Sequence, residues 1–551
     1  MRTFAIVFLL TLLVCGACLV GPGCSLFPPD DCASHLRCSA VDQDAPTDGD
    51  DVDAMPLAES AVADVDGSDV ATSEGGDGTL DGTNLPDRAC DPTKSPHDAP
   101  CVVEVGGAVF VAPLASGGSD ATGNGTRSAP YATIGHALAN LAGRGRVYIC
   151  DGTYAESVSL AVPASLFGGL SCPDGDGGWN YIGGTADIHG EQNRIPLEID
   201  RVPGAIAIED LAIAAANASG QDDAGNGRSS IGALVNASTV VFRRCSFTAA
   251  SGDNGVHGGT SSNYSNATAP NGSANDGGIG GAGATIVCGD GTNSRGGNGG
   301  NGAPLMGAAG KDGSASPMPP ITMPGFDGLG GSGGLTNCSG GNPGANGLAG
   351  DDGGAATSGN YGTLSATGWS ASAGGSGRNG NPGQGGGGGS GKSAPTLGGA
   401  GGGAGGCGGA GGIGGGGGGA SIALACIESV VTLERCTLAA SAAGNGGNGS
   451  VGQPGQGGGS SASAACSGGY GGNGAGGGGG TGGAGGVSVC VLYKGNGPTG
   501  TRSCAAGPAG MPGGRGQGGA GGTNALNNAA PDGGPGADGL SGVSDAALQV
   551  P

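Results

Sequence analysis

Three short segments of the chain carry the same arrangement of apolar side chains, in which a charged dipeptide separates two alternating pairs. The apolar residues are Ile206, Ile208, Leu211 and Ile213 in the first segment, Val240, Phe242, Cys245 and Phe247 in the second, and Val431, Leu433, Cys436 and Leu438 in the third. Alternation predicts short strands that each bury one face. Because a continuous strand would not skip a position, the charged dipeptide predicts a corner at which the alternation starts again.

A further alternating strand precedes the second and third segments. Its apolar residues are Ile231, Ala233 and Val235 in one copy and Ile422, Leu424 and Cys426 in the other, and the corners that follow end at Ser238 and Ser429. Residues 231–255 align with 422–446 without gaps. Three strands and two corners describe one turn of a triangular coil, and stacking such turns buries the inward side chains against those above and below.

The pattern therefore predicts an all-β fold, a right-handed parallel β-helix. Val487, Val489 and Val491 predict the first strand of a later turn. The alternative is a β-sandwich built from several hairpins. It is the weaker interpretation, because the charged two-residue corners lack the Asn-Gly or Asp-Gly pairs typical of hairpin turns.

Residues 109–160 carry a set of motifs that precedes these turns. The motif residues are Gly118, Ser119 and Asp120, then Pro130, Tyr131, Thr133, Ile134, Ala137 and Leu138, and finally Val147, Ile149, Gly152, Tyr154 and Glu156. This stretch resembles a bacterial domain of unknown function that opens many exported pectin-lyase-like β-helix proteins. The resemblance implies the fold and no chemistry.

Glycine dominates the sequence between the predicted strands. The chain has 136 glycines in 551 residues and only 3% aromatic residues, so much of it cannot build a conventional core. Irregular tracts follow each predicted turn at residues 217–230, 252–419 and 443–486. All would leave the β-helix at the same corner.

Many of these glycines recur at every third position, for example Gly399, Gly402, Gly405, Gly408, Gly411, Gly414 and Gly417. Period three is the pitch of the polyproline II helix. Collagen is a poor interpretation, because the triplet phase breaks repeatedly and the whole chain has only 31 prolines. Two interpretations stay open: bundles of polyproline II helices, as in the glycine-rich antifreeze proteins that the tracts resemble, or disordered hydrated loops.

The N-terminus predicts export. Residues 1–24 combine Arg2 with an apolar run and then small residues, as in a secretory signal, and the run is too short for a transmembrane helix. Cys18 and Cys24 are candidates for lipidation of a bacterial lipoprotein, and simple secretion is the alternative. Residues 25–100 are acidic and poor in aromatic residues, which predicts a disordered spacer.

The remaining cysteines predict disulfides, since an exported chain folds in an oxidising compartment. Cys150 and Cys172 bracket one turn of the predicted β-helix and are the candidate pair. The net charge of -24, without a basic stripe, argues against nucleic acid as a partner. We expect no cofactor or metal and no membrane contact beyond the lipid anchor, and the sequence leaves the oligomeric state open.

Catalytic motifs occur only without their required context. Residues 386–393 satisfy the phosphate-binding loop pattern, yet no strand precedes them and no helix follows. Ser332 mimics a hydrolase elbow and fails for the same reason. Asp222, Asp223 and His257 weakly resemble the polygalacturonase pattern.

The sequence thus divides into a signal at 1–24, a spacer at 25–100, β-helix at 101–251, a glycine-rich insertion at 252–419, one β-helix turn at 420–442, and a glycine-rich region at 443–551 with one strand at 487–492. We expect a non-enzymatic cell-envelope surface protein, an outer-membrane or cell-surface lipoprotein, that presents the β-helix for adhesion or for contact with matrix or carbohydrate. The first rival is a carbohydrate-active enzyme, a polysaccharide lyase or hydrolase, favoured if its polar residues converge on one groove. The second is a structural or ice-interacting coat module, favoured if the glycine tracts form an ordered bundle.

Overall fold

The computed structural model describes residues 90–173, 178–260, 264, 266–351, 353, 360–463, 466–526 and 528–551. These residues are nearly all strand or extended chain. The helical elements among them are η1 (Pro100–Val103), η2 (Leu114–Ser116) and α1 (Ile134–Ala139). None of the described helices has the length and apolar character needed to cross a bilayer.

The larger parallel sheet has eleven strands, and its strand order runs out to β21 and then back again. It runs from β1 (Ala108–Val111) through β2 (Arg146–Cys150), β5 (Ser165–Leu170), β8 (Ala205–Glu209) and β11 (Thr239–Arg243) to β21 (Val430–Ala440). It then returns through β12 (Ser246–Ala249), β9 (Leu211–Ala214), β6 (Ala186–His189) and β3 (Gly152–Ala155), and β23 (Thr499–Ala505) pairs with β21. The long strand β21 belongs to both halves.

The second parallel sheet has six strands. Their order is β24 (Ser544–Gln549), β22 (Ser488–Lys494), β20 (Ser421–Ile427), β10 (Ser230–Asn236), β7 (Leu197–Asp200) and β4 (Val158–Leu160). Each pass of the chain adds one strand to each half of the larger sheet and then one strand here, as in β8, β9 and β10. Strands β23 and β24 were not predicted from the sequence.

The repeated apolar template lies in register on neighbouring strands. Val240 pairs with Ile206 on one side and with Val431 on the other. All three side chains are buried, and their exposed fractions are 0%, 4% and 3%. Ile231 likewise pairs with Ile422, so the two aligned segments found in the sequence lie side by side. The predicted stacking of these residues is confirmed.

The charged dipeptides mark the predicted corners. Asp210, Arg244 and Arg435, each the second residue of its pair, have φ values of 57°, 53° and 58°. This left-handed conformation is rare for residues with a Cβ and turns the chain sharply. The side-chain alternation therefore restarts after each dipeptide.

One part of the face assignment was wrong. Ala233 and Val235 point into the main core, as predicted, but Ile231 belongs to a second apolar cluster on the opposite face of the six-stranded sheet. Its partner Ile422 does the same. This sheet is buried on both faces because the hairpin of β16 (Gly362–Ser365) and β17 (Gly368–Ala371) packs on the outer one. The sequence predicted one buried face for each strand.

The N-terminal motif residues hold α1 in place. Asp120 accepts hydrogen bonds from the Ala132 amide (2.8 Å) and from the Thr133 hydroxyl (2.8 Å). Glu156 accepts from the amides of Ile134 (2.8 Å) and Gly135 (2.9 Å) at the helix start. Glu156 thus satisfies N–H groups that the first turn of a helix leaves unpaired, and Asp120 holds the two residues before the helix. Their role is structural.

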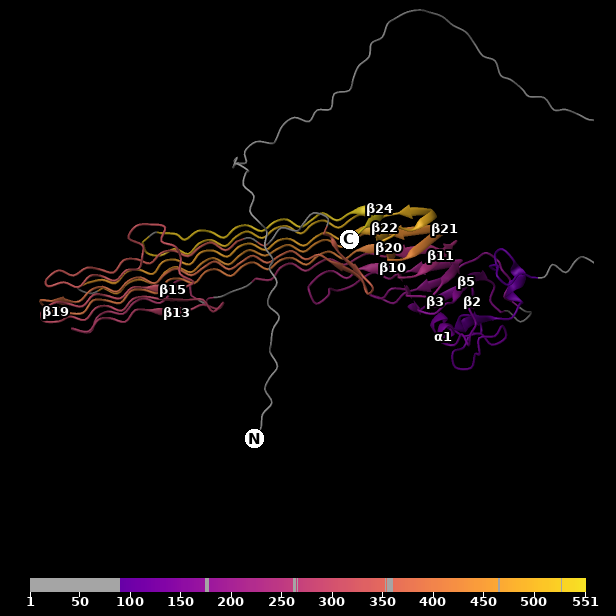
Figure 1. Ribbon diagram of the computed structural model, residues 1–551, viewed down its shortest axis with the longest axis horizontal. Helices are drawn as coiled ribbons and strands as arrows, with labels where there is room; N and C mark the ends of the chain where they lie inside the picture. Colours follow the sequence, from indigo (N-terminus) through magenta and orange to yellow (C-terminus); the bar gives the residue numbers. More distant parts are fainter. Residues whose placement is uncertain are drawn as a thin grey trace, which may run out of the picture. The chain divides into compact units, whose positions relative to one another are not determined.

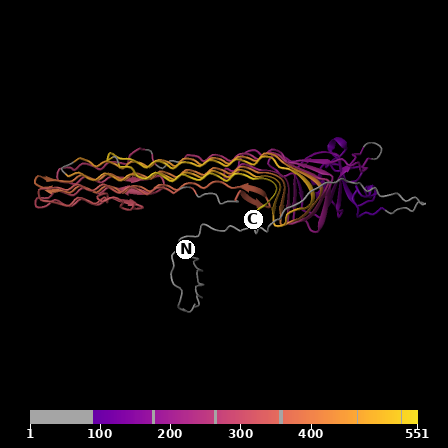
Figure 2. The same cartoon turned by 90° about the horizontal axis from the view of Figure 1, so that it is seen from above.

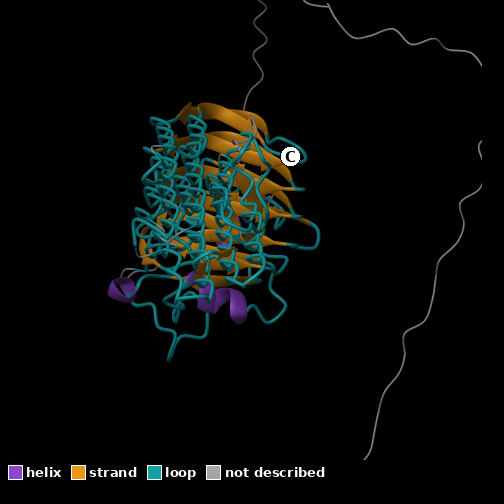
Figure 3. Ribbon diagram, turned by 90° about the vertical axis from the view of Figure 1, so that its left-hand side faces the viewer, coloured by secondary structure: helices purple, strands orange, loops and turns teal. Residues whose placement is uncertain are grey.

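The glycine-rich tracts all leave at one junction, between the returning half of the larger sheet and the six-stranded sheet. They comprise residues 215–229, 250–420, 441–487 and 506–543. The last was not predicted as a separate tract. Figures 1 and 2 show the tracts running side by side away from the strands, and Figure 3 views them from their far end.

Backbone hydrogen bonds join these tracts at every third residue. The amides of Gly374, Gly377, Gly380 and Gly383 donate to the carbonyls of Gly415, Gly412, Gly409 and Gly406, each at 2.8 Å. The amides of Gly406, Gly409 and Gly412 donate in turn to Gly472, Ala475 and Gly478 at 2.8–2.9 Å. The tracts are thus packed as a hydrogen-bonded bundle, which is the arrangement that the first of the two interpretations requires.

Close approach of neighbouring backbones explains why two positions in the tracts, 402 and 405, are glycine. A Cβ on Gly402 would lie 2.0 Å from the carbonyl oxygen of Gly386, and one on Gly405 would lie 1.9 Å from that of Gly383. No side chain fits at such distances. Glycine therefore permits the tracts to touch through their backbones.

Polar side chains complete the hydrogen bonding at the edge of the bundle. The side chain of Asn254 accepts from the Asn445 amide (2.7 Å), and that of Asn445 accepts from the Met511 amide (2.8 Å). His257 and Asn448 continue the same pattern: Nδ1 of His257 accepts from the Asn448 amide (2.8 Å). At this edge, a side chain of each tract thus accepts a hydrogen bond from a backbone amide of the next tract.

Short antiparallel hairpins extend from the longest tract. They are formed by β13 (Thr285–Val287), β14 (Asn293–Arg295) and β15 (Ser314–Ser316), and by β18 (Lys392–Ser393) with β19 (Thr396–Leu397). The glycine-rich pattern did not predict them.

Candidate functional site

A groove runs along the outer face of the six-stranded sheet, beside the β16–β17 hairpin. It consists of two adjoining hollows of about 180 and 240 Å³. Both hollows are lined by Asn193, Arg194, Ile195 and Thr367. The first three precede β7, and Thr367 lies in the turn of the hairpin.

The hairpin is seated by apolar contacts. A Cβ on Gly368 would lie 3.3 Å from Cδ1 of Ile231 and 3.7 Å from Cδ1 of Ile195, so the hairpin turn lies close against the sheet. Leu364 is buried and Trp369 is partly buried in the same cluster. The glycine insertion thus supplies one wall of the groove.

Two polar atoms in the walls have no hydrogen-bond partner among the described residues. They are Nε1 of Trp369, in the first hollow, and Oγ of Ser157, in the second. A polar atom buried without a partner costs free energy, so groups of this kind often belong to a binding site. Both atoms are themselves covered by the surrounding chain, although their residues line the two hollows.

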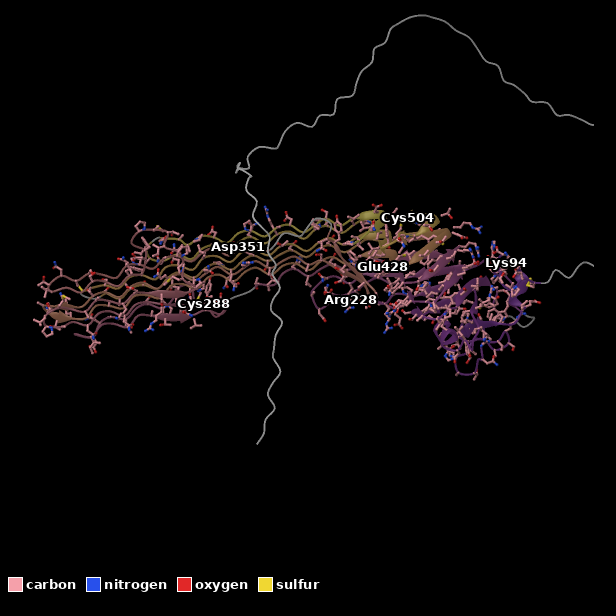
Figure 4. The ribbon with its side chains drawn as sticks, viewed as in Figure 1. Lys94, Arg228, Cys288, Asp351, Glu428 and Cys504 are labelled. Carbon is pink, nitrogen blue, oxygen red and sulfur yellow. A yellow bond between two sulfur atoms is a disulfide. The ribbon has the colours of Figure 1, made fainter. Side chains whose placement is uncertain are left out.

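Charges of both signs line the groove. Arg194 and Arg228 supply positive charge, and Asp222 and Glu198 supply negative charge. Figure 4 places Arg228 near the sheets, whereas Cys288 lies out along the tracts. Desolvation by the surrounding chain raises the pKa of Glu198 above its usual range, and the nearby charge of Arg194 opposes this shift.

The residues that resemble the polygalacturonase pattern do not come together in the groove. Of the three, which are all described, only Asp222 lines it. Its carboxylate accepts from the amides of Ala224 and Asn226, both at 2.9 Å, so it stabilises its own turn. His257 lies in the bundle edge, where it accepts the Asn448 amide.

The nucleotide-binding and hydrolase motifs have no supporting structure. Residues 386–393 are extended chain within the bundle, where Gly388 donates to the Lys311 carbonyl (2.8 Å). Ser332 lies in an extended tract as well. Neither stands between a strand and a helix.

Cysteines Cys150 and Cys172 form a disulfide. The other bridges among the described residues are Cys90–Cys101, Cys288–Cys407, Cys338–Cys466 and Cys490–Cys504. The lipidation candidates Cys18 and Cys24 lie outside the described residues. No group of three or more His, Cys, Asp or Glu side chains in the described part of the chain is placed to hold a metal ion.

Sequence reasoning missed most of the groove, including Trp369, Arg194 and Glu198. The signal for Trp369 was its position: it is one of two tryptophans in the chain and stands alone within a glycine-rich tract. No family model, no curated protein and no solved structure matches the chain. The fold therefore defines only a class, a nearly all-β protein with large parallel sheets, and the groove is interpreted from its own residues.

Proposed function

We propose that this chain is an exported, non-enzymatic cell-envelope protein that presents a right-handed parallel β-helix for contact with carbohydrate. The β-helix interpretation is supported by passes of three strands that pair in parallel and in register, as β8, β9 and β10 do with their neighbours. Connections between parallel strands are right-handed in nearly all proteins, which supports the hand. The pectin-lyase-like resemblance points the same way.

Export and surface anchoring are supported by the N-terminal sequence and by the disulfides. An apolar run after Arg2 is typical of a signal peptide, and Cys18 or Cys24 would carry the lipid. Five disulfides among the described residues favour an oxidising compartment. The acidic spacer would then hold the folded part away from the membrane.

The glycine tracts serve in this proposal as a rigid arm of polyproline II helices. Hydrogen bonds at every third residue and the contact of Gly402 with the Gly386 carbonyl support this assignment. Such a bundle orders many residues without a large apolar core. The longest tract also contains the β16–β17 hairpin, which forms one wall of the groove.

The observation that carries carbohydrate contact is the groove beside Trp369. Sugars bind where an aromatic surface lies next to polar groups that can exchange hydrogen bonds with hydroxyls. Trp369 lines the first hollow, and Asn193, Arg194 and Arg228 supply hydrogen-bond donors in the walls. An elongated polar ligand such as an oligosaccharide fits this arrangement.

Binding of the full chain to a glycan array, followed by calorimetry with the best oligosaccharide, tests the proposal. We expect Trp369→Ala and Arg228→Ala each to weaken binding by about 10-fold, a loss of 1.4 kcal/mol. The exposed Arg378→Ala, in the bundle, is the matched control and should bind as the wild type does. Failure of the wild type to bind any glycan would reject carbohydrate contact.

A carbohydrate-active enzyme is the second candidate. It is favoured by Glu198 and Asp222, which line adjoining hollows, because a carboxylic acid with a raised pKa and a carboxylate are the pair that cleaves glycosidic bonds. Release of reducing ends from a polysaccharide by the full chain, abolished by Glu198→Gln, would replace the non-enzymatic proposal.

The bundled tracts also favour the third class, a structural or ice-interacting coat module. Inhibition of ice recrystallisation by the full chain would support it. Normal crystal growth at high protein concentration would reject the ice-interacting form.

A further inference from the structure

Several turns of the glycine bundle meet around the β18–β19 hairpin, at the end of the tracts that is remote from the sheets (Figure 1). Gly302 donates to the Gly278 carbonyl (2.8 Å), and Gly307 donates to Gly334 (3.2 Å). The Ser393 amide donates to the Leu335 carbonyl of the neighbouring turn (3.2 Å). We define the distal tip as residues 277–281, 302–307, 334–339 and 391–398.

The distal tip exposes large apolar side chains. The exposed fractions are 64% for Ile279, 83% for Leu305, 60% for Met306 and 62% for Leu335. Side chains of this kind are usually buried, and a cluster of them on the surface marks an interaction site.

One of the four described methionines, Met306, lies in the distal tip. The described methionines are Met306, Met318, Met323 and Met511, and all of them are exposed, whereas the buried core of the described chain contains none. Methionine adapts its shape to irregular apolar partners and is favoured on such surfaces. Three of the four lie on turns of the longest glycine tract.

The tip can enter an apolar phase without leaving these amides unpaired. The hydrogen bonds of Gly302, Gly307 and Ser393 cross-link the turns, so these three amides do not depend on water. Lys392 lies on the hairpin itself, in a chain whose net charge is -24. A lysine beside an apolar tip is complementary to lipid phosphate, which its long side chain can reach.

A second copy of the chain is a poorer occupant. Four side chains expose roughly 400 Å², the size of the largest apolar patch on an ordinary monomer. A stable protein interface buries about 800 Å² on each partner. Insertion into lipid has no such threshold, because each side chain gains by leaving water on its own.

We propose that the distal tip inserts Leu305, Met306 and Leu335 into the surface of a lipid bilayer, with Lys392 at the level of the phosphates. This contact is separate from the groove and from the lipid anchor that the N-terminal sequence predicts. The glycine bundle holds the tip away from the sheets, so the protein would bridge a membrane and whatever occupies the groove.

Flotation of the full chain with vesicles tests the proposal. We expect binding to phosphatidylcholine vesicles and stronger binding when phosphatidylglycerol is included. The double variant Leu305→Ser with Met306→Ser should lower the partition coefficient by about 10-fold or more. The matched control, Val451→Ser with Met511→Ser, changes exposed apolar residues outside the tip and should bind as the wild type does.

A direct depth measurement completes the test. Tryptophan placed by Leu305→Trp should shift to shorter emission wavelengths with vesicles and be quenched by brominated lipid. Absence of wild-type binding to both vesicle types would overturn the proposal, as would unchanged binding of the Leu305→Ser, Met306→Ser variant. Concentration-dependent dimerisation that this variant abolishes, without vesicle binding, would instead assign the tip to a second copy.

Discussion

Arg244 reaches across the corner to Glu209 on the preceding pass, with Nη2 2.6 Å from Oε2. The same guanidinium contacts Asp210, with Nε 2.6 Å from Oδ1. Glu209 and Asp210 are buried, with side-chain exposed fractions of 1% and 6%. Hydrogen bonding to these carboxylates outweighs desolvation and raises the pKa of Arg244, so the arginine stays charged.

Removing this arginine should destabilise the sheets strongly. Arg244→Ala would leave the buried Asp210 without a cation, while Glu209 would keep only Arg243, and removing one partner of a buried ion pair typically costs about 3 to 5 kcal/mol. Urea denaturation followed by circular dichroism measures the loss in the free energy of unfolding. Arg201→Ala is the control, because its pair with Asp200 is exposed and should contribute less than about 1 kcal/mol. Equal effects of the two variants would contradict the structural role of the corner.

Adding a methyl group inside the bundle should loosen it. Gly402→Ala places a Cβ 2.0 Å from the Gly386 carbonyl oxygen, and rigid neighbouring backbone cannot yield without breaking hydrogen bonds. We expect a loss of about 1 to 3 kcal/mol and faster hydrogen exchange at Gly386, whose amide donates to Gly403. Exchange measured by mass spectrometry on peptides of this tract checks the prediction.

Gly259→Ala is the matched control for that experiment. Its Cβ would lie 3.9 Å from Cδ1 of Ile413, an ordinary contact, so exchange in the bundle should not change. Unchanged exchange in Gly402→Ala as well would mean that the tracts are not packed through their backbones. The disordered-loop interpretation would then be preferred.

The repeating strands could be predicted because every copy obeys the same local rule. Stacking places equivalent residues such as Ile206, Val240 and Val431 side by side, so one template identifies many contacts. The facing of Ile231 could not be predicted in this way. It depends on a hairpin that begins at Gly362, more than a hundred residues later, and no local pattern records that contact.

The groove was less predictable than the fold for the same reason. Arg194 precedes β7 and Glu198 lies in it, whereas Trp369 comes from an insertion whose path is fixed by backbone contacts between glycines. Glycine has no side chain that could form an apolar pattern. The sequence of the tract therefore does not predict that the β16–β17 hairpin packs against the six-stranded sheet. The sequence pattern likewise does not indicate that edge residues such as Asn445 bond to the neighbouring tract.

Truncating a buried residue of β21 should lower the free energy of unfolding more than truncating an exposed residue of the same strand. Leu433 is fully buried in β21, so Leu433→Ala should cost about 2 to 5 kcal/mol through the cavity it leaves. Val430→Ala, on the same strand, changes a side chain that is 56% exposed and should cost less than about 1 kcal/mol. Urea denaturation compares them. Similar costs would mean that β21 does not face a core at Leu433.

The thiol of Cys426 should be inert in the folded protein. Burial raises its pKa to about 12, and the thiolate is the form that reacts with iodoacetamide. Because the folded pKa lies above the unfolded one, the thiol form favours folding at neutral pH, and this contribution is lost as the pH rises toward 12. Native alkylation of Cys426, mapped by mass spectrometry at pH 8, should therefore be at least about 100-fold slower than in denaturant and should accelerate with pH. Rapid modification at pH 8 would show that the inner face of β20 opens to solvent, contrary to the packed core described above.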